Sequence, residues 1–186
     1  MSVAGFAQQE VGTFTIQPKV GLNIANLAKT DGDPRFGVAV GAELEYQLTD
    51  IFSLSAGALY SMQGNKTTGT ALGSTATLTQ KLDYVNIPVL ANVYVVRGLA
   101  VKVGVQPAFK VSSKLSGSVT TPLGGGSDAT DINANTFDLS IPVGVSYELA
   151  NFVLDARYNF GVTKIRENMD PTNSVFQITL GYKFAL

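Results

Sequence analysis

The sequence predicts an all-β protein, an eight-stranded antiparallel up-and-down transmembrane β-barrel. Apolar and polar residues alternate with period two over eight segments, and no segment shows a helical period. The chain of 186 residues is 45% hydrophobic and only 15% charged, which is few charges for a soluble domain. No apolar run approaches the length of a transmembrane helix. Two classes remain, a soluble β protein and a membrane barrel, because only helices and closed barrels satisfy the backbone in lipid.

Short and long connections alternate between the eight segments, so that all tight turns lie at one end of the sheet and all long loops at the other. Gly98 is expected in the left-handed position of a three-residue bulged turn. To close the barrel, the last segment should pair antiparallel with the first, with Lys183 in the region of Thr15 and Gln17. The alternating segments cover residues 14–24, 36–48, 52–62, 82–95, 99–111, 137–149, 152–162 and 175–186.

The fourth segment changes its alternation. Leu82 and Tyr84 share one parity, whereas from Val85 onward the apolar residues occupy the other parity. Because a one-residue slip reverses every side chain, we predict a β-bulge near Tyr84 and Val85. Prolines inside strands need a bulge, a rim position or a substitute donor, and the sequence does not say which of these applies. These prolines are Pro18, Pro88, Pro107 and Pro142.

The polar face of the sheet is predicted to line the barrel interior. Eight strands enclose a space just wide enough for side chains, and the strand glycines all lie on the polar face. The apolar faces carry no charged residue, and so large an outward apolar surface exceeds what a soluble monomer exposes. Lipid is therefore the expected solvent, whereas a soluble lipocalin-type barrel would have the reverse arrangement. The predicted lumen charge network comprises Lys19, Glu43, Glu45, Lys81, Asp83, Lys102, Lys110, Asp138, Glu148, Asp155, Arg157 and Lys183.

The aromatic residues predict two interfacial girdles. All Phe and Tyr except Phe6 and Tyr94 fall on the outward face, mostly near strand ends, as at the two interfaces of a membrane barrel. A general preference of aromatics for strands does not explain why they avoid the strand middles. The predicted girdle residues are Phe14, Phe36, Tyr46, Phe52, Tyr60, Tyr84, Phe109, Phe137, Tyr147, Phe152, Tyr158, Phe160, Phe176, Tyr182 and Phe184.

Composition argues against catalysis and against nucleic-acid binding. The chain has no Cys and no His, which removes thiolate chemistry and the commonest general base. The net charge of −1 provides no basic field. We therefore expect no enzyme and no cofactor. Calcium could find oxygen ligands in the stretch Asp31-Gly32-Asp33 or at Asp128 and Asp131, but ordinary turns explain these residues better.

Residues 1–12 are predicted to form an N-terminal segment that precedes a barrel domain of residues 13–186. Gly5-Phe6-Ala7 is typical of the small-x-small end of a signal peptide, and an ordinary disordered N-terminus is the alternative.

Three stretches carry a family resemblance: K-V-G-L-N-I-A-N-L from Lys19 to Leu27, Y-V-N-I-P-V-L-A from Tyr84 to Ala91, and L-G-Y-K-F from Leu180 to Phe184. With them the chain resembles the PorT-like small outer-membrane β-barrels of Bacteroidetes-type bacteria. The resemblance implies an outer-membrane location and, from the founding member, a role in secretion and maturation of exported proteins. The closing strand also resembles the terminal signal that the barrel-assembly machinery reads, although Ala185 and Leu186 follow the aromatic residue here.

We therefore predict a monomeric outer-membrane barrel in contact with the lipid bilayer and the lipopolysaccharide leaflet. The N-terminus and the tight turns are expected in the periplasm, and the long loops outside the cell. The expected function is structural or surface interaction, with a plugged, charge-balanced lumen and with loops 65–79 and 112–135 facing an unknown protein partner. Disorder of loop 112–135 is an alternative. The alternative functions are an accessory role in secretion and a narrow channel, whose lining would be Glu43, Glu45, Lys102 and Arg157.

Overall fold

A computed structural model describes residues 9–28, 33–71, 74–121, 124–131, 136–164 and 172–186 of the chain. These residues form eleven β-strands. The described part of the chain contains no helix that is long and apolar enough to cross a membrane. The strands are β1 (Phe14–Ala28), β2 (Asp33–Thr49), β3 (Phe52–Ala71), β4 (Ser74–Asn86), β5 (Val89–Val96), β6 (Leu99–Thr121), β7 (Gly124–Asp131), β8 (Phe137–Leu149), β9 (Phe152–Lys164), β10 (Thr172–Tyr182) and β11 (Phe184–Ala185).

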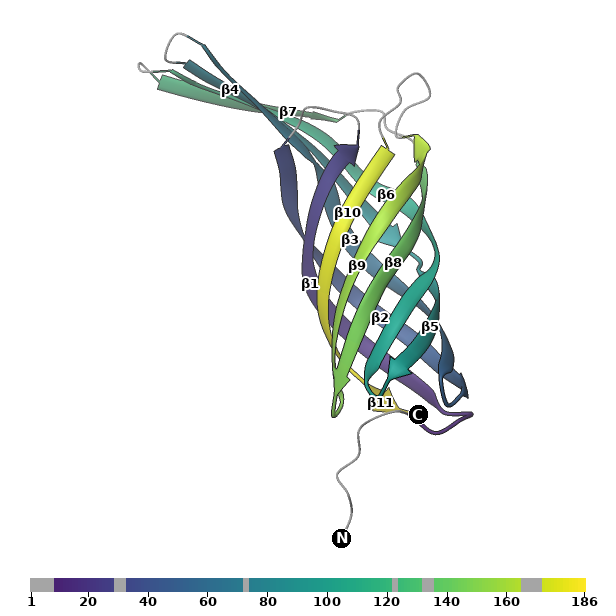
Figure 1. The fold of residues 1–186 in the computed structure, drawn as a ribbon. Coiled ribbons are helices and arrows are strands. Elements are labelled where there is room, and N and C mark those ends of the chain that lie inside the picture. The colour runs from purple at the N-terminus through teal and green to yellow at the C-terminus, as the bar shows by residue number, and fades with distance from the viewer. Residues whose placement is uncertain (1–8, 29–32, 72–73, 122–123, 132–135, 165–171) are drawn as a thin grey trace.

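The strands close into a ring of eight positions (Figure 1). β4 and β5 follow one another in a single position between β3 and β6, and β11 continues β10 along β1. β1 and β10 close the ring antiparallel, with Lys19 opposite Gly181 and Ile24 opposite Phe176. The predicted closure is confirmed. Lys183 lies between this ladder and the pair Ile16–Phe184, and is therefore beside Gln17.

Both described chain ends lie at the tight-turn end of the barrel (Figure 1). The Leu186 amide donates to the Phe14 carbonyl at 2.9 Å, and the Gly12 amide donates to the Gln47 carbonyl at 2.8 Å. Gly98 has a φ of 78°, as expected for the left-handed position of its turn. The short connections and the two ends therefore share one rim.

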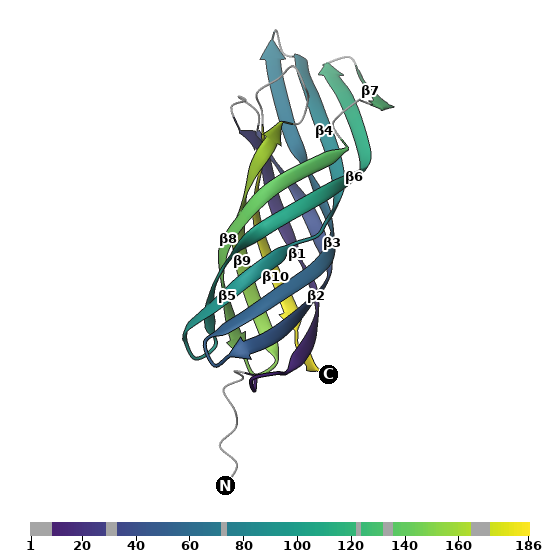
Figure 2. The ribbon, with the colours of Figure 1, turned by 90° about the vertical axis from the view of Figure 1, so that its right-hand side faces the viewer.

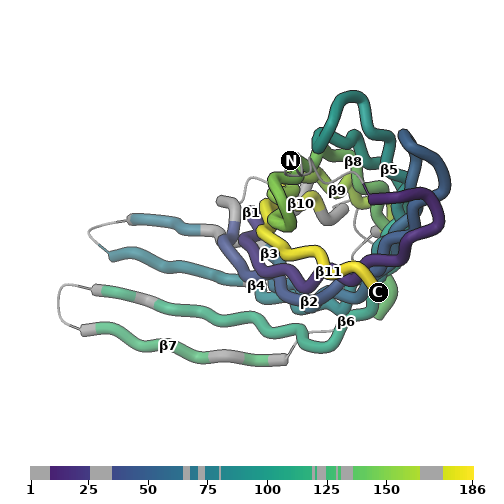
Figure 3. The backbone as a smooth tube through the Cα atoms, turned by 90° about the horizontal axis from the view of Figure 1, so that it is seen from below, coloured from purple at the N-terminus to yellow at the C-terminus, as the bar shows by residue number. Residues whose placement is uncertain are grey.

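Burial is inverted relative to a soluble protein. Apolar side chains such as Val103, 47% exposed, and Leu180, 51% exposed, cover the outside of the ring, whereas Asn23, Ser53 and Asp155 are fully buried inside it. Figure 3 shows the ring from the tight-turn end. The alternation of each strand produces this arrangement, because successive side chains point to opposite faces. The prediction that the polar face lines the interior is confirmed.

The four in-strand prolines lie where the ladders between strands are interrupted. A proline has no N–H to donate, and at an interruption the ladder does not need that donor. Pro18 faces the break between β10 and β11. Pro142 lies in a gap of the β6–β8 ladder, between the paired residues Ser140 and Val143. Pro88 and Pro107 share a third break, between β4 and β5. There the Ile87 amide donates to the Pro107 carbonyl at 2.8 Å, and the Gly57 amide donates to the Pro88 carbonyl at 3.0 Å.

Two stretches predicted as loops are strands instead. Residues 65–71 of β3 and 74–80 of β4 form one hairpin, and residues 113–121 of β6 with β7 form a second. The hairpins pair with each other, Thr75 opposite Thr120, and form a four-stranded sheet that we call the blade. The blade leans away from the barrel at the long-loop end (Figures 1 and 2). Threonine favours strands, and sheet without a buried face shows no apolar alternation, so the sequence pattern missed it.

The assignment of Tyr84, Lys81 and Asp83 was wrong, because β4 keeps one alternation throughout. Tyr84 is 1% exposed and points inward with Leu82, whereas Lys81 is exposed and Asp83 half-buried on the outer side. The extra residue lies on β6, since Asp83 pairs with Ser112 and Tyr84 with Lys110. The polarity reverses here because this part of β4 lies beyond the apolar band, where the outside is polar and apolar side chains turn inward.

Candidate functional site

Five charged side chains meet in the middle of the barrel interior. They come from inward positions of four strands: β1, β2, β6 and, twice, β9. Each of them is at most 4% exposed, so each charge needs partners within the protein. We call them the central cluster: Lys19, Glu43, Lys102, Asp155 and Arg157.

Asp155 is the hub of the central cluster. Arg157, two residues along β9 and thus on the same face, donates from Nε to Oδ1 at 2.8 Å and from Nη2 to Oδ2 at 2.7 Å. Lys102 Nζ donates to Oδ2 at 2.9 Å, and Lys19 Nζ lies 3.7 Å from the same oxygen. Three cations therefore converge on one carboxylate, and the guanidinium supplies the bidentate geometry that is strongest in such pairs.

Glu43 provides the second carboxylate of the central cluster. Lys19 Nζ donates to its Oε2 at 2.8 Å, and Arg157 Nη2 lies 3.0 Å from its Oε1. Arg157 and Lys19 thus each contact both acids. With three cations and two carboxylates, the cluster has a formal charge of +1.

A second cluster, the basal cluster, lies nearer the tight-turn end and consists of Glu45, Tyr94, Glu148 and Lys183. Lys183 Nζ donates to Glu148 Oε2 at 2.6 Å and to the Tyr94 hydroxyl at 3.1 Å, and lies 3.1 Å from Glu45 Oε2. The Tyr94 hydroxyl donates to Glu45 Oε1 at 2.6 Å. Two carboxylates and one cation give −1, which cancels the +1 of the central cluster.

Tyr94 is a site residue that the sequence analysis did not assign. It is 7% exposed, and it donates to one member of the basal cluster while accepting from another. The available signal was its position. Val93 and Val95 are outward on β5, so Tyr94 is an inward aromatic in a chain whose other strand aromatics were expected to face lipid.

Amide and hydroxyl groups, together with Asp138, fill the interior toward the long-loop end. Asn23 Nδ2 donates to Ser61 Oγ at 2.9 Å, and Gln177 Nε2 donates to Asn23 Oδ1 at 2.8 Å. A polar cavity of about 10 Å³ lies in this layer, room for roughly one water molecule. Its polar lining comprises Gln63, Asn86, Gln106, Asp138, Ser140 and Asn159.

Inward glycines make room for the charged side chains. A Cβ at Gly57 would lie 2.5 Å from Glu43 Cγ, and one at Gly144 would lie 2.6 Å from Arg157 Cβ. Either contact is closer than packed atoms tolerate. The glycines on the polar face are therefore a steric requirement of the charge clusters that they adjoin.

The structure separates the predicted lumen charges into three groups. Lys110 is half-buried at an inward position, and Lys81 and Asp83 lie outside the interior, where Arg35 Nη1 approaches Asp83 Oδ1 to 3.8 Å and the Tyr60 hydroxyl donates to Asp83 Oδ2 at 3.1 Å. The others are buried inside: Lys19, Glu43, Glu45, Lys102, Asp138, Glu148, Asp155, Arg157 and Lys183.

The predicted girdle aromatics, Tyr84 excepted, are exposed or half-exposed on the outer surface. Several meet across strands near the barrel rims. Phe14 and Tyr46 are Cα partners with ring centroids 4.4 Å apart, and Phe152 and Tyr182 are partners at 5.1 Å. Such pairs contribute about 0.5–1.5 kcal/mol beyond their burial.

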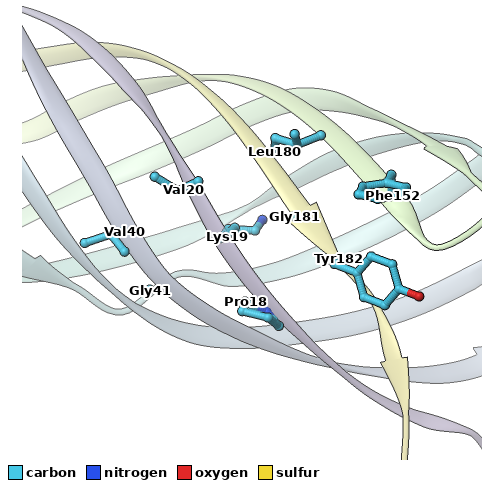
Figure 4. A pocket seen from close by; sticks show the side chains of 9 residues that line it. All are labelled: Pro18, Lys19, Val20, Val40, Gly41, Phe152, Leu180, Gly181 and Tyr182. Carbon is cyan, nitrogen blue, oxygen red and sulfur yellow. The ribbon is translucent and has the colours of Figure 1, made fainter.

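The outer wall is hollowed along the seam between β1 and β10. An apolar groove of about 360 Å³ is lined by residues of β1, β2, β9 and β10, with the Phe152 and Tyr182 side chains toward the tight-turn end (Figure 4). A second apolar groove of about 300 Å³ shares Val20 and Leu180 with it. Both belong to the outward surface, and the lining of the first includes Lys19, a residue of the central cluster.

Comparison with known proteins identifies the family. The model of the outer membrane protein beta-barrel domain matches residues 6–167. The chain belongs to this family. It is therefore a protein of the bacterial outer membrane, where its apolar outer wall faces the lipid. No curated protein sequence matches the chain.

Solved outer-membrane barrels share the fold at low sequence identity. Neisserial surface protein A is 17% identical with a TM-score of 0.53, and the match covers 92% of this chain and 97% of that one. Ail, the attachment invasion locus protein of Yersinia pestis, is 12% identical with a TM-score of 0.51, over 94% of this chain and 100% of Ail.

Within the described ranges, no group of three or more acidic side chains could hold a metal ion. Asp31 and Gly32, part of one calcium hypothesis, lie outside the described residues. The same holds for residues 1–8, so the signal-peptide hypothesis stays a prediction.

Proposed function

We propose that this outer-membrane barrel is a surface-interaction protein with a plugged lumen, and that the blade is its interaction element. The observation that carries the proposal is the blade itself. β6 has 23 residues, against 13 in β8 and β9, so the chain builds ordered sheet well beyond the length that crosses the membrane. The proposed orientation puts the blade outside the cell and the tight turns in the periplasm.

The charge clusters support the plugged lumen. Their eight ionised groups come to zero net charge, and ion pairs link members from strands that are not neighbours in the ring, such as Glu43 of β2 with Arg157 of β9. An ion passing through would have to separate pairs at 2.6–3.1 Å, and breaking a buried pair is costly. Glu43, Glu45, Lys102 and Arg157, the lining of the alternative channel, are all engaged in these pairs.

Conductance in planar bilayers tests the plug. We expect purified protein to insert without single-channel events, while a porin in the same bilayers conducts. Stable events in the wild-type protein whose ion selectivity changes in Glu45→Gln would contradict the plug and support the channel.

The free edges of the blade support its role in interaction. Among the described strands, β7 pairs only with β6, and its other edge contains no Lys or Pro of the kind that usually protects an edge strand. Gly125 and Gly126 on this edge let another backbone approach closely. We infer that the partner is a polypeptide segment in extended conformation that adds a strand to the sheet.

The orientation of the blade is tested with single cysteines, because the chain has none. Thr130 lies exposed on the blade opposite Leu115, and Arg97 lies exposed in the tight turn between β5 and β6. A membrane-impermeant maleimide on intact cells should label Thr130→Cys, and label Arg97→Cys only after the outer membrane is permeabilised. Labelling of Arg97→Cys alone would reverse the proposed orientation.

Three narrower predictions belong to this proposal. The resemblance to PorT-like barrels supports an accessory role in secretion as the alternative function. The closing strand supports recognition by the barrel-assembly machinery during insertion. The proposed state is a monomer, without catalytic activity, whose residues 1–12 precede the barrel domain.

A further inference from the structure

The two faces of the blade differ in chemistry. Leu82 and its Cα partner Ser113 are buried at the inward side of the barrel rim. Alternation from this pair places Ala76, Leu78 and Leu115 on one face of the blade and hydroxyl groups and lysines on the other. We call the latter the hydroxyl–lysine face, defined by Thr75, Thr77, Lys81, Lys114, Ser116 and Ser118. It continues the outer, lipid-facing surface of the barrel.

Lys81 and Lys114 lie directly opposite each other in the β4–β6 ladder. Both are exposed, and neither forms an ion pair with another described residue. Like charges directly opposite across strands are destabilising, so folding alone does not favour this pair. β7 sets Asp131 opposite Lys114, whereas β3 sets Gly64 opposite Lys81. Asp83, two residues along β4 on the same side as Lys81, has Arg35 Nη1 at 3.8 Å from its Oδ1.

The hydroxyl–lysine face is turned toward the membrane. The blade is seen nearly edge-on in Figure 1, where it leans outward, and its strands lie spread side by side in Figure 3, which looks from the tight-turn end. When the outer surface of a barrel bends away from the barrel axis in this way, that surface faces the membrane. Lys81 is four residues along β4 from Val85, the partner of the girdle residue Phe109, which is about 13 Å of strand. The lysines therefore lie at the level of lipid headgroups.

We propose that the hydroxyl–lysine face binds the phosphorylated sugar headgroup of an outer-leaflet glycolipid. Lysines supply the cations that phosphate requires, and rows of Ser and Thr hydroxyls donate to and accept from sugar hydroxyls and phosphate oxygens. The proposal rests on the proposed orientation, since only the outer leaflet holds such lipids. The two faces of the blade then have different surroundings. The hydroxyl–lysine face contacts membrane lipid, and the opposite face contacts water or a protein partner.

Adjacent spin labels test which face meets the membrane. Thr77→Cys places a label on the hydroxyl–lysine face, and Leu78→Cys places one on the opposite face. In vesicles whose lipids carry a paramagnetic metal chelate on the headgroup, the label at residue 77 should relax more strongly than the label at residue 78. Equal relaxation, or stronger relaxation at residue 78, overturns the proposal. Because the chelate lipid is in both leaflets, the result does not depend on orientation in the cell, which the maleimide experiment tests separately.

Lysine variants test the chemistry. Wild-type protein in nanodiscs should retain bisphosphorylated lipid A, measured by native mass spectrometry, and retain its dephosphorylated form less. Lys81→Ser and Lys114→Ser should each weaken retention about fivefold, while Arg97→Ser, which removes a cation at the other rim, should not. Equal retention of both lipids, or a Lys81→Ser/Lys114→Ser double variant that retains lipid like the wild type, overturns the proposal. A heat-modifiable band on gels verifies that each variant is folded.

Discussion

Replacing Asp155 with asparagine is expected to lower the free energy of unfolding by about 3–5 kcal/mol, the range for breaking a buried ion pair by removal of one partner. Asp155 is fully buried and accepts from Lys102 and Arg157, with Lys19 at 3.7 Å. Asparagine keeps the volume but removes the charge. Glu43 is then the one carboxylate of the central cluster that remains beside its three buried cations. Urea unfolding of protein folded into lipid vesicles measures the change.

Two further variants separate charge from local damage. Glu10→Gln changes an exposed acid outside the barrel, and it should alter the unfolding free energy by less than about 0.5 kcal/mol. The double variant Asp155→Asn/Lys102→Met removes one cation together with the carboxylate, so it should lose less stability than the sum of the two single changes. A loss below 1 kcal/mol in Asp155→Asn, or strictly additive effects, would show that the central cluster is not coupled.

Most of the barrel follows from the sequence because lipid imposes a strict pattern. Each crossing strand must be apolar outside and fit small or polar groups inside, and the charges of the central cluster follow this rule without exception. The partners within the lumen were beyond prediction. Which acid meets which base depends on register and on how the ring brings β2 near β9, as in the Glu43–Arg157 pair, and alternation alone contains no such information.

The predictions from the sequence are wrong in those parts of the chain that extend beyond the apolar core of the membrane. Near Tyr84 the strand passes from an apolar to a polar surrounding, so the apolar residues change sides although the backbone keeps its alternation. In the blade both faces lie outside the apolar band, so residues 65–79 show no period that would indicate strands. The hairpins depend on backbone pairing between β3, β4, β6 and β7, which leaves only a weak preference in composition.

An arginine at Val103 is expected to lower the free energy of unfolding by about 2–4 kcal/mol, the range for an arginine facing the middle of the bilayer. Val103 is outward and 47% exposed. It lies four residues along β6 from Leu99, the partner of the girdle residue Tyr147, and six from the girdle residue Phe109. Val103→Arg therefore puts a charge into the apolar band, away from both interfaces, where solvation is poorest.

Leu78 provides a matched control for the same substitution. It is 52% exposed but lies on the blade, on the face turned away from the membrane. Leu78→Arg should therefore change stability by less than about 0.5 kcal/mol. The two aliphatic side chains are nearly equally exposed, yet their replacement by arginine is expected to lower stability by very different amounts, because one faces lipid and the other faces water. If both substitutions have equal effects in vesicles, the band around Val103 does not face lipid. If Val103→Arg costs as much in a water-soluble amphipol as in vesicles, the loss comes from packing rather than from the bilayer.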